Sequence, residues 1–429
     1  MGFIRIFLMR SFGVFFVLVT SYSLGGCTKQ EIAGPVPDAG GIPVVSPIPK
    51  TPPAIAYPPD NKPLDLAAEI ELGRHFFYDK QMSADGSTSC ATCHQLQNGF
   101  ADVLPFSKGF QNLSGVRNAP GLTNVAYNTA FAWDGKFSSL EKHALGPIFN
   151  FLEMGNNFST GKDASVDTLG NTYNSKPGSN DTLLLFGRLD GFPGIRSAIA
   201  EPNSPRKDLQ NNNYYILLKK AWGPVTIPAT TDGGQTMTTM TTIAYTMDII
   251  TKSLAAFERT IISNSAPFDR YNSGDATALS TSGARGFKLF IDQTKANCIA
   301  CHSGYNFTDQ SYHNNGSVLI PSKDIGRAAI TNQDSDRFKF KTPILRNVSL
   351  TRPYMHDGHI GTGAPDARTA LTAVVNNYNA GGNHSKNQDA RVKPLNLSDQ
   401  DVADIVEFLM QLQDGSFISN ASLGNPWGN

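Results

Sequence analysis

Apolar residues recur at helical spacing in three stretches of the chain. Between positions 66 and 77 they lie at steps of four, three and four, and from 247 to 261 and from 402 to 412 they repeat every three or four positions. This spacing places them on one face of a helix. Ser398 and Asp401 form a capping-box pattern in front of the third stretch. These patterns predict a mainly α-helical chain.

Other stretches lack such periodicity. Residues 27–61 are rich in Pro, Gly and Val, which is typical of a semi-extended tether. Residues 155–179 and 201–242 are polar and rich in Gly, Asn and Thr. We expect them to form long loops, inserted into the first of two domains, and few short strands elsewhere.

A weak internal repeat indicates two similar domains. Gly73-Arg-His-Phe-Phe-Tyr precedes one C-x-x-C-H motif, and Gly286-Phe-Lys-Leu-Phe-Ile precedes another. In each copy a short helix leads through a polar loop to the motif. The predicted domains are residues 62–242 and 243–429, and the length of 429 residues suits two cores of ordinary size.

The N-terminus has the features of an export signal. Arg5 and Arg10 precede a short apolar segment, residues 11–24, that is under the roughly 20 residues of a membrane span. The run that ends at Cys27 resembles a bacterial lipobox, so residues 1–26 are predicted to be removed and Cys27 to carry lipid. This implies a lipid-anchored protein on the periplasmic side of a bacterial envelope, at the outer membrane. The alternative is an ordinary signal peptide with a coincidental cysteine.

The charge pattern does not favour nucleic acid as a partner. The formal net charge is zero, and no long basic or acidic run occurs. The chemistry instead lies in the cysteines. Apart from Cys27, all of them belong to two C-x-x-C-H motifs, one formed by Cys90, Cys93 and His94 and the other by Cys298, Cys301 and His302.

In such a motif the two cysteines attach a haem covalently and the histidine binds its iron. A pair of disulfides or a zinc site are the alternatives. A zinc site would need paired motifs close together, and these motifs lie far apart in the sequence. The sequence therefore predicts two c-type haems.

Longer blocks around the motifs resemble the bacterial di-haem cytochrome c peroxidase/MauG family. The resemblance extends over residues 64–412, with gaps at the two insertions, and its most specific blocks are residues 72–94, 117–128, 256–271 and 341–358. It implies two cytochrome c-like haem domains, one that reacts with peroxide and one that transfers or stores electrons.

The resemblance also implies roles for individual residues. Trp133 matches the tryptophan that relays electrons between the haems, and Glu153 matches the distal glutamate of the peroxide site. A poised carboxyl can move the proton that cleavage of an O–O bond requires. His143 stands where the family usually has a glutamine, and either polarises the distal pocket or fills space.

Position 110 departs from many members of the family. They carry a histidine sixteen residues after the proximal one, and it blocks the peroxide haem until the other haem is reduced. This chain has Phe110 there. Phenylalanine cannot bind iron, so we expect the peroxide haem to be five-coordinate and open in the resting protein.

The sixth ligand of the second haem is a methionine in typical peroxidases and a tyrosine in MauG-like members. Tyr378 takes this position if about eight residues are inserted near positions 361–368. The alternative is that Tyr378 is a core residue and Met355 is the ligand. The family also binds calcium between the haems, and the matching residues are Asn118, Thr351 and Pro353.

We expect a peroxidase that reduces hydrogen peroxide with electrons from an external donor such as a c-type cytochrome. The main alternative is a MauG-like oxidase that modifies tyrosine or tryptophan on a partner protein. A second alternative is an electron-transfer conduit, which needs neither an open haem nor Glu153.

Overall fold

The computed structural model describes residues 35–37, 43–83, 85–155, 247–319 and 322–428, together with short stretches at 164–166, 172–174, 217, 220–222, 231–232 and 235–236. Cys27, the predicted site of lipidation, lies outside the described residues. So do most of the two predicted insertions.

Helices make up most of the regular structure in the described part of the chain. The α-helices are α1 (Leu66–Tyr78), α2 (Cys90–Cys93), α3 (Leu140–Phe149), α8 (Met247–Glu258), α9 (Pro267–Ser273), α10 (Thr281–Ile291), α11 (Ala328–Thr331), α12 (Ala367–Asn379) and α13 (Asp399–Met410). Short 3-10 turns are η1 (Lys80–Met82), η2 (Leu96–Asn98), η3 (Phe110–Asn112), η4 (Val125–Tyr127), η6 (Cys298–Ala300), η7 (Asp334–Asp336), η8 (Val348–Leu350) and η9 (Ala421–Leu423).

Strands are few and form antiparallel pairs. The pairs are β1 (Pro35–Pro37) with β2 (Pro43–Val45), β3 (Ala164–Val166) with β4 (Thr172–Asn174), β5 (Thr231–Asp232) with β6 (Gln235–Thr236), and β7 (Tyr312–His313) with β8 (Phe340–Lys341). For the described residues, the prediction of a mainly helical chain with few short strands is confirmed.

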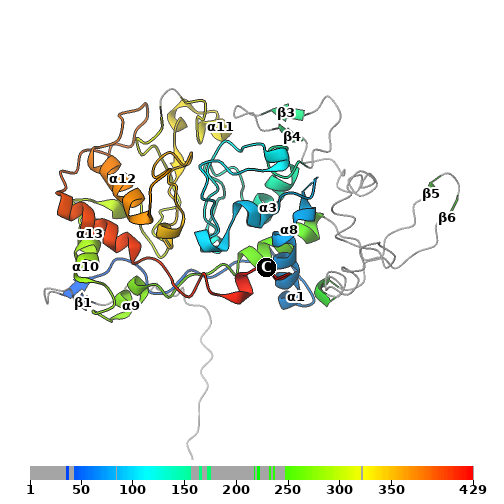
Figure 1. The fold of residues 1–429 in the computed structure, drawn as a ribbon, viewed down its shortest axis with the longest axis horizontal. Coiled ribbons are helices and arrows are strands. Elements are labelled where there is room, and N and C mark those ends of the chain that lie inside the picture. Colours follow the sequence, from blue (N-terminus) through cyan, green and yellow to red (C-terminus); the bar gives the residue numbers. More distant parts are fainter. Residues whose placement is uncertain are drawn as a thin grey trace, which may run out of the picture.

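The helices form two lobes that lie side by side (Figure 1). One lobe contains α1, α3 and α8, and the other contains α9, α10, α12 and α13. Each has its own buried core, rich in phenylalanine, with Phe76, Phe77 and Phe257 in the first and Phe268, Phe287 and Phe408 in the second. Two separate cores explain why the chain folds as two haem domains.

Polar caps fix where the main helices begin. Asp65 accepts a hydrogen bond from the backbone of Ala68 at 3.0 Å and so starts α1. Ser280 does the same for α10. The capping box of Ser398 and Asp401 in front of α13 is present as the sequence predicts. These caps satisfy backbone N–H groups that would otherwise lack partners.

The internal repeat corresponds to a pair of crossed helices in each lobe. α1 packs against α8, and α10 packs against α13. At each crossing a glycine meets the backbone of the other helix. A Cβ on Gly73 would lie 1.7 Å from the Ser253 carbonyl oxygen, and one on Gly286 would lie 1.9 Å from that of Asp404. Only glycine permits this approach, so the repeated glycines set the helix spacing.

Replacing either glycine with alanine should therefore destabilise its lobe. Alanine favours a helix by about 1 kcal/mol, but overpacking against rigid backbone costs roughly 1–3 kcal/mol or more. We expect Gly73→Ala and Gly286→Ala to lower the midpoint of denaturant unfolding of the haem-loaded protein. Gly415→Ala is the control, because a Cβ there meets nothing within 4 Å. An equal effect in all three variants would contradict this account of the crossings.

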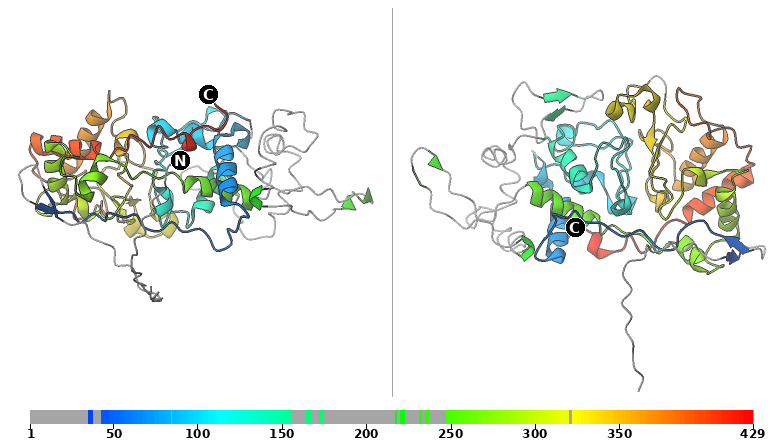
Figure 2. Two further views of the ribbon diagram at one scale, coloured as in Figure 1. Left: turned by 90° about the horizontal axis from the view of Figure 1, so that it is seen from below. Right: turned by 180° about the vertical axis from the view of Figure 1, so that it is seen from behind.

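The N-terminal segment does more than tether the folded body. Within the predicted tether, Ile48 is fully buried in the second core. Further along, the Ala56 carbonyl oxygen accepts a hydrogen bond from Arg259 Nε at 3.1 Å in the first lobe. Figure 2 shows the segment running along both lobes. A Pro-rich stretch without periodicity can still pack, because its isolated apolar residues find pockets made by distant elements.

The chain also crosses between the lobes after the predicted domain boundary. That boundary at residue 243 assigns α8 to the second domain, whereas α8 packs in the core of the first. Near the C-terminus Phe417 and Leu423 return to the same first core. The sequence does not indicate this packing, because the long polar insertion before α8 separates it from its packing partner α1.

No helix among the described residues is both long enough and apolar enough to cross a membrane.

Candidate functional site

The two C-x-x-C-H motifs adopt closely similar local structures. Cys90 and Cys93 lie on α2, and the backbone N–H of His94 donates to the Cys90 carbonyl oxygen at 2.9 Å. In the second motif His302 donates in the same way to Cys298 at 2.8 Å. The cysteines that the structure describes form no disulfides. Each motif is thus a single turn that carries its cysteines and histidine together.

Both histidines are oriented by a backbone carbonyl. His94 Nδ1 lies 2.8 Å from the Phe100 carbonyl oxygen, and His302 Nδ1 lies 2.9 Å from that of Phe307. Because a carbonyl oxygen only accepts, each Nδ1 carries the proton and each Nε2 keeps a lone pair. Phe100 and Phe307 both have left-handed backbone conformations, with φ of 58° and 56°.

These histidines have the chemistry of iron ligands. Burial lowers the pKa of both imidazoles, which favours the neutral form that binds metal. A ligand histidine that donates its other N–H to a carbonyl is a common feature of metal sites. Two cysteines and one such histidine in each lobe fit covalently attached haem, with Nε2 of His94 and His302 as the atoms that would hold iron.

A cavity of about 300 Å³ lies where the two lobes meet. Many of the residues that the sequence marks as functional line it. Those from the first lobe are Trp133, His143 and Asn118, and those from the second are Cys298, Cys301, His302, Thr351, Pro353, Met355 and Tyr378. The structure therefore brings the second motif, the predicted relay, the predicted calcium ligands and both candidate sixth ligands to one cavity.

Glu153 lies apart from this cavity and close to the first motif. It is partly buried just beyond the end of α3, and its charge acts on Cys90 and Cys93. Asn150 Nδ2 donates to Glu153 Oε1 at 2.6 Å. Burial raises the pKa of Glu153, while the Asn150 hydrogen bond and Lys136 act against that rise. A carboxyl whose pKa is raised holds a proton more readily than an exposed one, which suits a group that accepts a proton and passes it on.

Phe110 is locked against Glu153. Its backbone N–H donates to the Glu153 carbonyl oxygen at 2.7 Å, and its ring packs on Phe151. Gly109 permits this approach, because a Cβ there would lie 2.2 Å from the Leu152 carbonyl oxygen. The side chain that stands at the position of the family's blocking histidine is thus an aromatic ring, fixed beside the proposed proton carrier.

His143 projects from α3 toward the same region. Its ring stacks near Phe131 and lies 5.4 Å from the ring of Phe137. Burial, and to a smaller extent the nearby His94, lowers its pKa to about 4. His143 is therefore neutral at physiological pH, and it is placed to offer a neutral imidazole near the first haem motif.

Trp133 is held at the junction between the lobes. Its Nε1 donates to the Asn118 carbonyl oxygen at 2.9 Å, and its own carbonyl oxygen accepts from the Lys341 backbone at 2.7 Å. The Asn118 backbone in turn donates to the His356 carbonyl oxygen at 2.7 Å. Trp133 is thus bonded to one segment from each lobe, which suits a residue lying between two redox centres.

Charged groups missed by the sequence analysis strengthen this junction. Arg117 pairs with Asp134, next to Trp133, at 2.6 Å and with Asp324 of the second lobe at 2.7 Å. Arg327 donates to the Asp134 carbonyl oxygen at 2.7 Å. Arg117 lies in a block that the family resemblance marks, but nothing in the sequence indicates its distant partner Asp324.

Both candidate sixth ligands contact one amide. Asn315 Nδ2 lies 3.0 Å from Tyr378 Oη and 3.5 Å from Met355 Sδ. Tyr378 lies near the end of α12, and burial raises its pKa to about 12, against which the Asn315 hydrogen bond acts. The geometry keeps both alternatives open, and Asn315 is a site residue that no sequence pattern indicated.

The predicted calcium ligands also converge. Asn118 is almost fully buried, and its Nδ2 donates to the Leu104 carbonyl oxygen at 3.0 Å. Its side-chain oxygen is therefore the atom left for a cation. Thr351 and Pro353 line the same cavity. Carbonyl and amide oxygens are suitable ligands for calcium.

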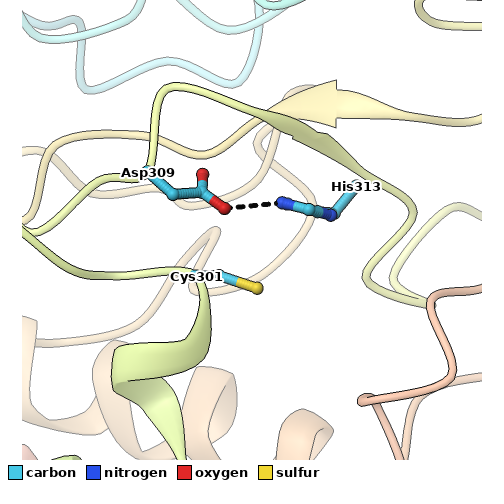
Figure 3. A group of neighbouring side chains, drawn as sticks. All are labelled: Cys301, Asp309 and His313. Carbon is cyan, nitrogen blue, oxygen red and sulfur yellow. Dashed lines mark hydrogen bonds and ion pairs between the residues drawn. The ribbon is translucent and has the colours of Figure 1, made fainter.

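A cysteine, an aspartate and a histidine also gather near the second motif (Figure 3). The group consists of Cys301, Asp309 and His313, and it has the spacing of a metal site. Asp309 Oδ2 lies 2.8 Å from His313 Nε2, and Asp389 lies 2.9 Å from Nδ1 of the same ring. Because Cys301 is a predicted haem-attachment cysteine and both ring nitrogens of His313 are engaged by carboxylates, this cluster fits a structural role.

Known proteins resemble the chain over most of its length. Residues 67–181 match a family model described as di-haem cytochrome c peroxidase, and residues 283–413 match a cytochrome c model. The methylamine utilization protein MauG of Methylophilus methylotrophus is 31% identical, covering 86% of this chain and 88% of that protein. The cytochrome c551 peroxidase of Pseudomonas aeruginosa is 30% identical and covers 68% of each chain.

A solved structure shows the same architecture. The crystal structure of a MauG-like protein associated with microbial copper homeostasis superposes with a TM-score of 0.66 at 25% sequence identity, covering 89% of this chain and 99% of that one. The prediction of two cytochrome c-like domains that carry c-type haem is confirmed. The roles of individual residues stay predictions.

Proposed function

This chain belongs to the di-haem cytochrome c peroxidase/MauG family, and from that premise we propose that it reduces hydrogen peroxide with electrons from an external donor such as a c-type cytochrome. It is an oxidoreductase that acts on peroxide. The proposal rests on one observation: different residues surround the two C-x-x-C-H motifs. A buried carboxyl, Glu153, accompanies the first motif, whereas Tyr378 and Met355 accompany the second.

Haem, when bound, supplies the iron that accepts electrons and binds peroxide. The protein moves a proton between the two peroxide oxygens and fixes the group that carries it. Glu153 takes a proton from one peroxide oxygen and returns it to the other, so that the bond between them breaks as water leaves. Asn150 fixes the carboxyl in place through its 2.6 Å hydrogen bond. His143 offers a neutral imidazole beside His94.

Electrons enter at the second lobe and cross the junction. Trp133 is the proposed relay, because it is bonded to segments of both lobes and lines the cavity that contains the second motif. Each peroxide consumes two electrons and two protons to give two waters. Because a c-type cytochrome carries one electron, two donor molecules are oxidised for each peroxide.

Phe110 removes the need for prior reduction in this proposal. Its ring cannot bind iron, and it is packed against Phe151 and fixed to Glu153. We therefore expect the haem-loaded, fully oxidised protein to react with peroxide at once when the two are mixed in a stopped-flow spectrometer. An electron paramagnetic resonance spectrum with a resting bis-histidine haem, or a reaction that begins only after one-electron reduction, would contradict this.

Steady-state turnover tests the function itself. The haem-loaded protein should oxidise a reduced c-type cytochrome rapidly when peroxide is added. Slow oxidation of the cytochrome, together with a fast and stable reaction with peroxide alone, would favour the MauG-like alternative, oxidation of tyrosine or tryptophan on a partner protein. The identity of 31% to one MauG, together with Phe110 and Tyr378, favours that candidate. A simple conduit would bind no CO in the reduced state.

Two further parts of the proposal concern calcium and location. A calcium ion bound by Asn118, Thr351 and Pro353 would join the lobes at the cavity, and this is supported by the fact that all three residues line it. We propose lipidation of Cys27 and attachment to the periplasmic side of the outer membrane, which the lipobox-like sequence supports. Loss of membrane association in Cys27→Ser tests the anchor.

A further inference from the structure

A buried lysine faces the cavity between the lobes, and none of the roles above involves it. Lys341 lies on β8, opposite Tyr312 of β7, and its side chain lines the cavity. The residue is only 7% exposed. Its backbone N–H donates to the Trp133 carbonyl oxygen, so its position at the junction is fixed.

The ammonium group of Lys341 lacks a carboxylate partner in the described part of the chain. Its Nζ donates to the neutral side-chain oxygen of Asn128 at 3.2 Å. The carboxylate whose charge reaches it, Asp309, is already bonded to His313 at 2.8 Å. Burial lowers the pKa of Lys341 to about 8. A buried ammonium without an opposite charge is costly, so such a group is normally paired.

The two arginines that line the same cavity are paired, and Lys393, which also lines it, is exposed. Arg346 lies 2.8 Å from Asp269, and Arg391 lies 2.7 Å from Asp389. Lys341 differs from them because it is buried and only an amide oxygen accepts a hydrogen bond from its ammonium group. The missing negative charge must come from whatever fills the cavity.

The internal repeat gives a second, independent reason. Lys341-Thr342-Pro343 corresponds to Asn118-Ala119-Pro120. Asn118 donates its backbone N–H to the His356 carbonyl oxygen at 2.7 Å, and Lys341 donates to that of Trp133 at the same distance. His356 and Trp133 each precede an Asp-Gly pair. Lys341 thus occupies in the second lobe the position that the proposed calcium ligand Asn118 occupies in the first.

We propose that Lys341 binds a propionate carboxylate of haem where the two lobes meet. Each haem brings carboxylates that need a positive partner when they are buried, and Lys341 offers the matching cation. This rests on the haem cavity of the proposed function, but it does not depend on peroxide chemistry. A cation here favours the reduced haem, because reduction adds a negative charge nearby.

Spectroelectrochemical titration of both haems in the full-length, haem-loaded protein tests the assignment. Lys341→Gln keeps a donor for Asn128 and removes the charge. We expect it to lower the midpoint potential of at least one haem, so that the ratio of reduced to oxidised haem at the original midpoint falls about tenfold, which is about 59 mV for a one-electron couple. Lys341→Arg keeps the charge and should restore the potential.

Lys339→Gln is the matched control. Lys339 lies two residues away, is more exposed and already pairs with Asp336 at 3.2 Å. Its replacement should leave both potentials unchanged. Potentials in Lys341→Gln equal to those of the original protein would overturn the proposal.

If Lys341→Gln folds poorly, the amount of haem attached to each variant tests the proposal instead. Loading that is lost in Lys341→Gln and regained in Lys341→Arg supports the proposal, because charge is then what the site requires. Loading lost in both would overturn it. Since potentials and loading are measured without peroxide, failure of this assignment is distinct from failure of the peroxidase function.

Discussion

Glu153→Gln should lower peroxide turnover by about 10²–10⁴-fold while leaving both haems attached. Glutamine has the shape of a protonated glutamate and can still accept the 2.6 Å hydrogen bond from Asn150. It cannot release and regain a proton. The loss should therefore appear in kcat with peroxide, whereas the haem absorption spectrum and CO binding to the reduced protein stay unchanged.

Glu258→Gln is the matched control for this prediction. Glu258 is a buried carboxyl of the same lobe, on α8, and its exposed fraction is 5%. Burial raises its pKa to about 8, so it is largely protonated at neutral pH. Glutamine then mimics the resting form of Glu258, and Glu258, like Glu153, lies close enough to the first motif for its charge to act on Cys90. Both variants remove a buried acid near the first motif, and only Glu153 is proposed to transfer a proton during the reaction.

A large loss in Glu153→Gln with little change in Glu258→Gln would assign the proton transfer to Glu153. Comparable losses in both would mean that a general disturbance of the first lobe, and not proton transfer, lowers the rate. Full activity in Glu153→Gln would remove the residue from the mechanism and assign the proton transfer to another group.

The sequence predicts the parts of this site that are local. A C-x-x-C-H motif is one turn of chain, so its geometry follows from five adjacent residues. The crossing glycines, Gly73 and Gly286, are visible as a repeat because each lobe builds the same helix pair. The capping box at Ser398 is equally local and is present as predicted.

Contacts made across the fold could not be predicted in this way. Asn315 meets Tyr378 across 63 positions, and Arg117 meets Asp324 across 207. No pattern marks such pairs, because their members lie in separate loops that only the complete fold brings together. Lys341 is a similar case: its lack of a carboxylate partner is a property of the packed cavity.

Replacing Tyr378 with methionine should raise the midpoint potential of the haem on His302, if Tyr378 is its sixth ligand. A phenolate is anionic and favours ferric iron, whereas a thioether is neutral and favours ferrous iron. Axial ligands tune haem potentials over about 0.8 V. We expect a rise of roughly a few tenths of a volt, measured by spectroelectrochemical titration, with the haem on His94 little affected.

Met355→Leu distinguishes the two candidates. Met355 lines the same cavity and lies 3.5 Å from the amide that also contacts Tyr378. If tyrosine is the ligand, leucine at 355 fills similar volume and leaves the potential nearly unchanged. If methionine is the ligand, the same change removes it, the potential falls, and the reduced haem gains an open site that binds CO.

The shared amide makes the choice between these ligands sensitive to a single hydrogen bond. Asn315 donates to Tyr378 Oη at 3.0 Å, and this bond opposes the rise in the phenol pKa that burial causes. It therefore favours the phenolate form that a tyrosine ligand requires. Asn315→Leu combined with Tyr378→Met should raise the potential no further than Tyr378→Met alone, because the amide acts through the phenolate. A midpoint potential higher in the double variant than in Tyr378→Met would show that Asn315 acts on the haem directly. Tyr378 would then not be the ligand that Asn315 supports.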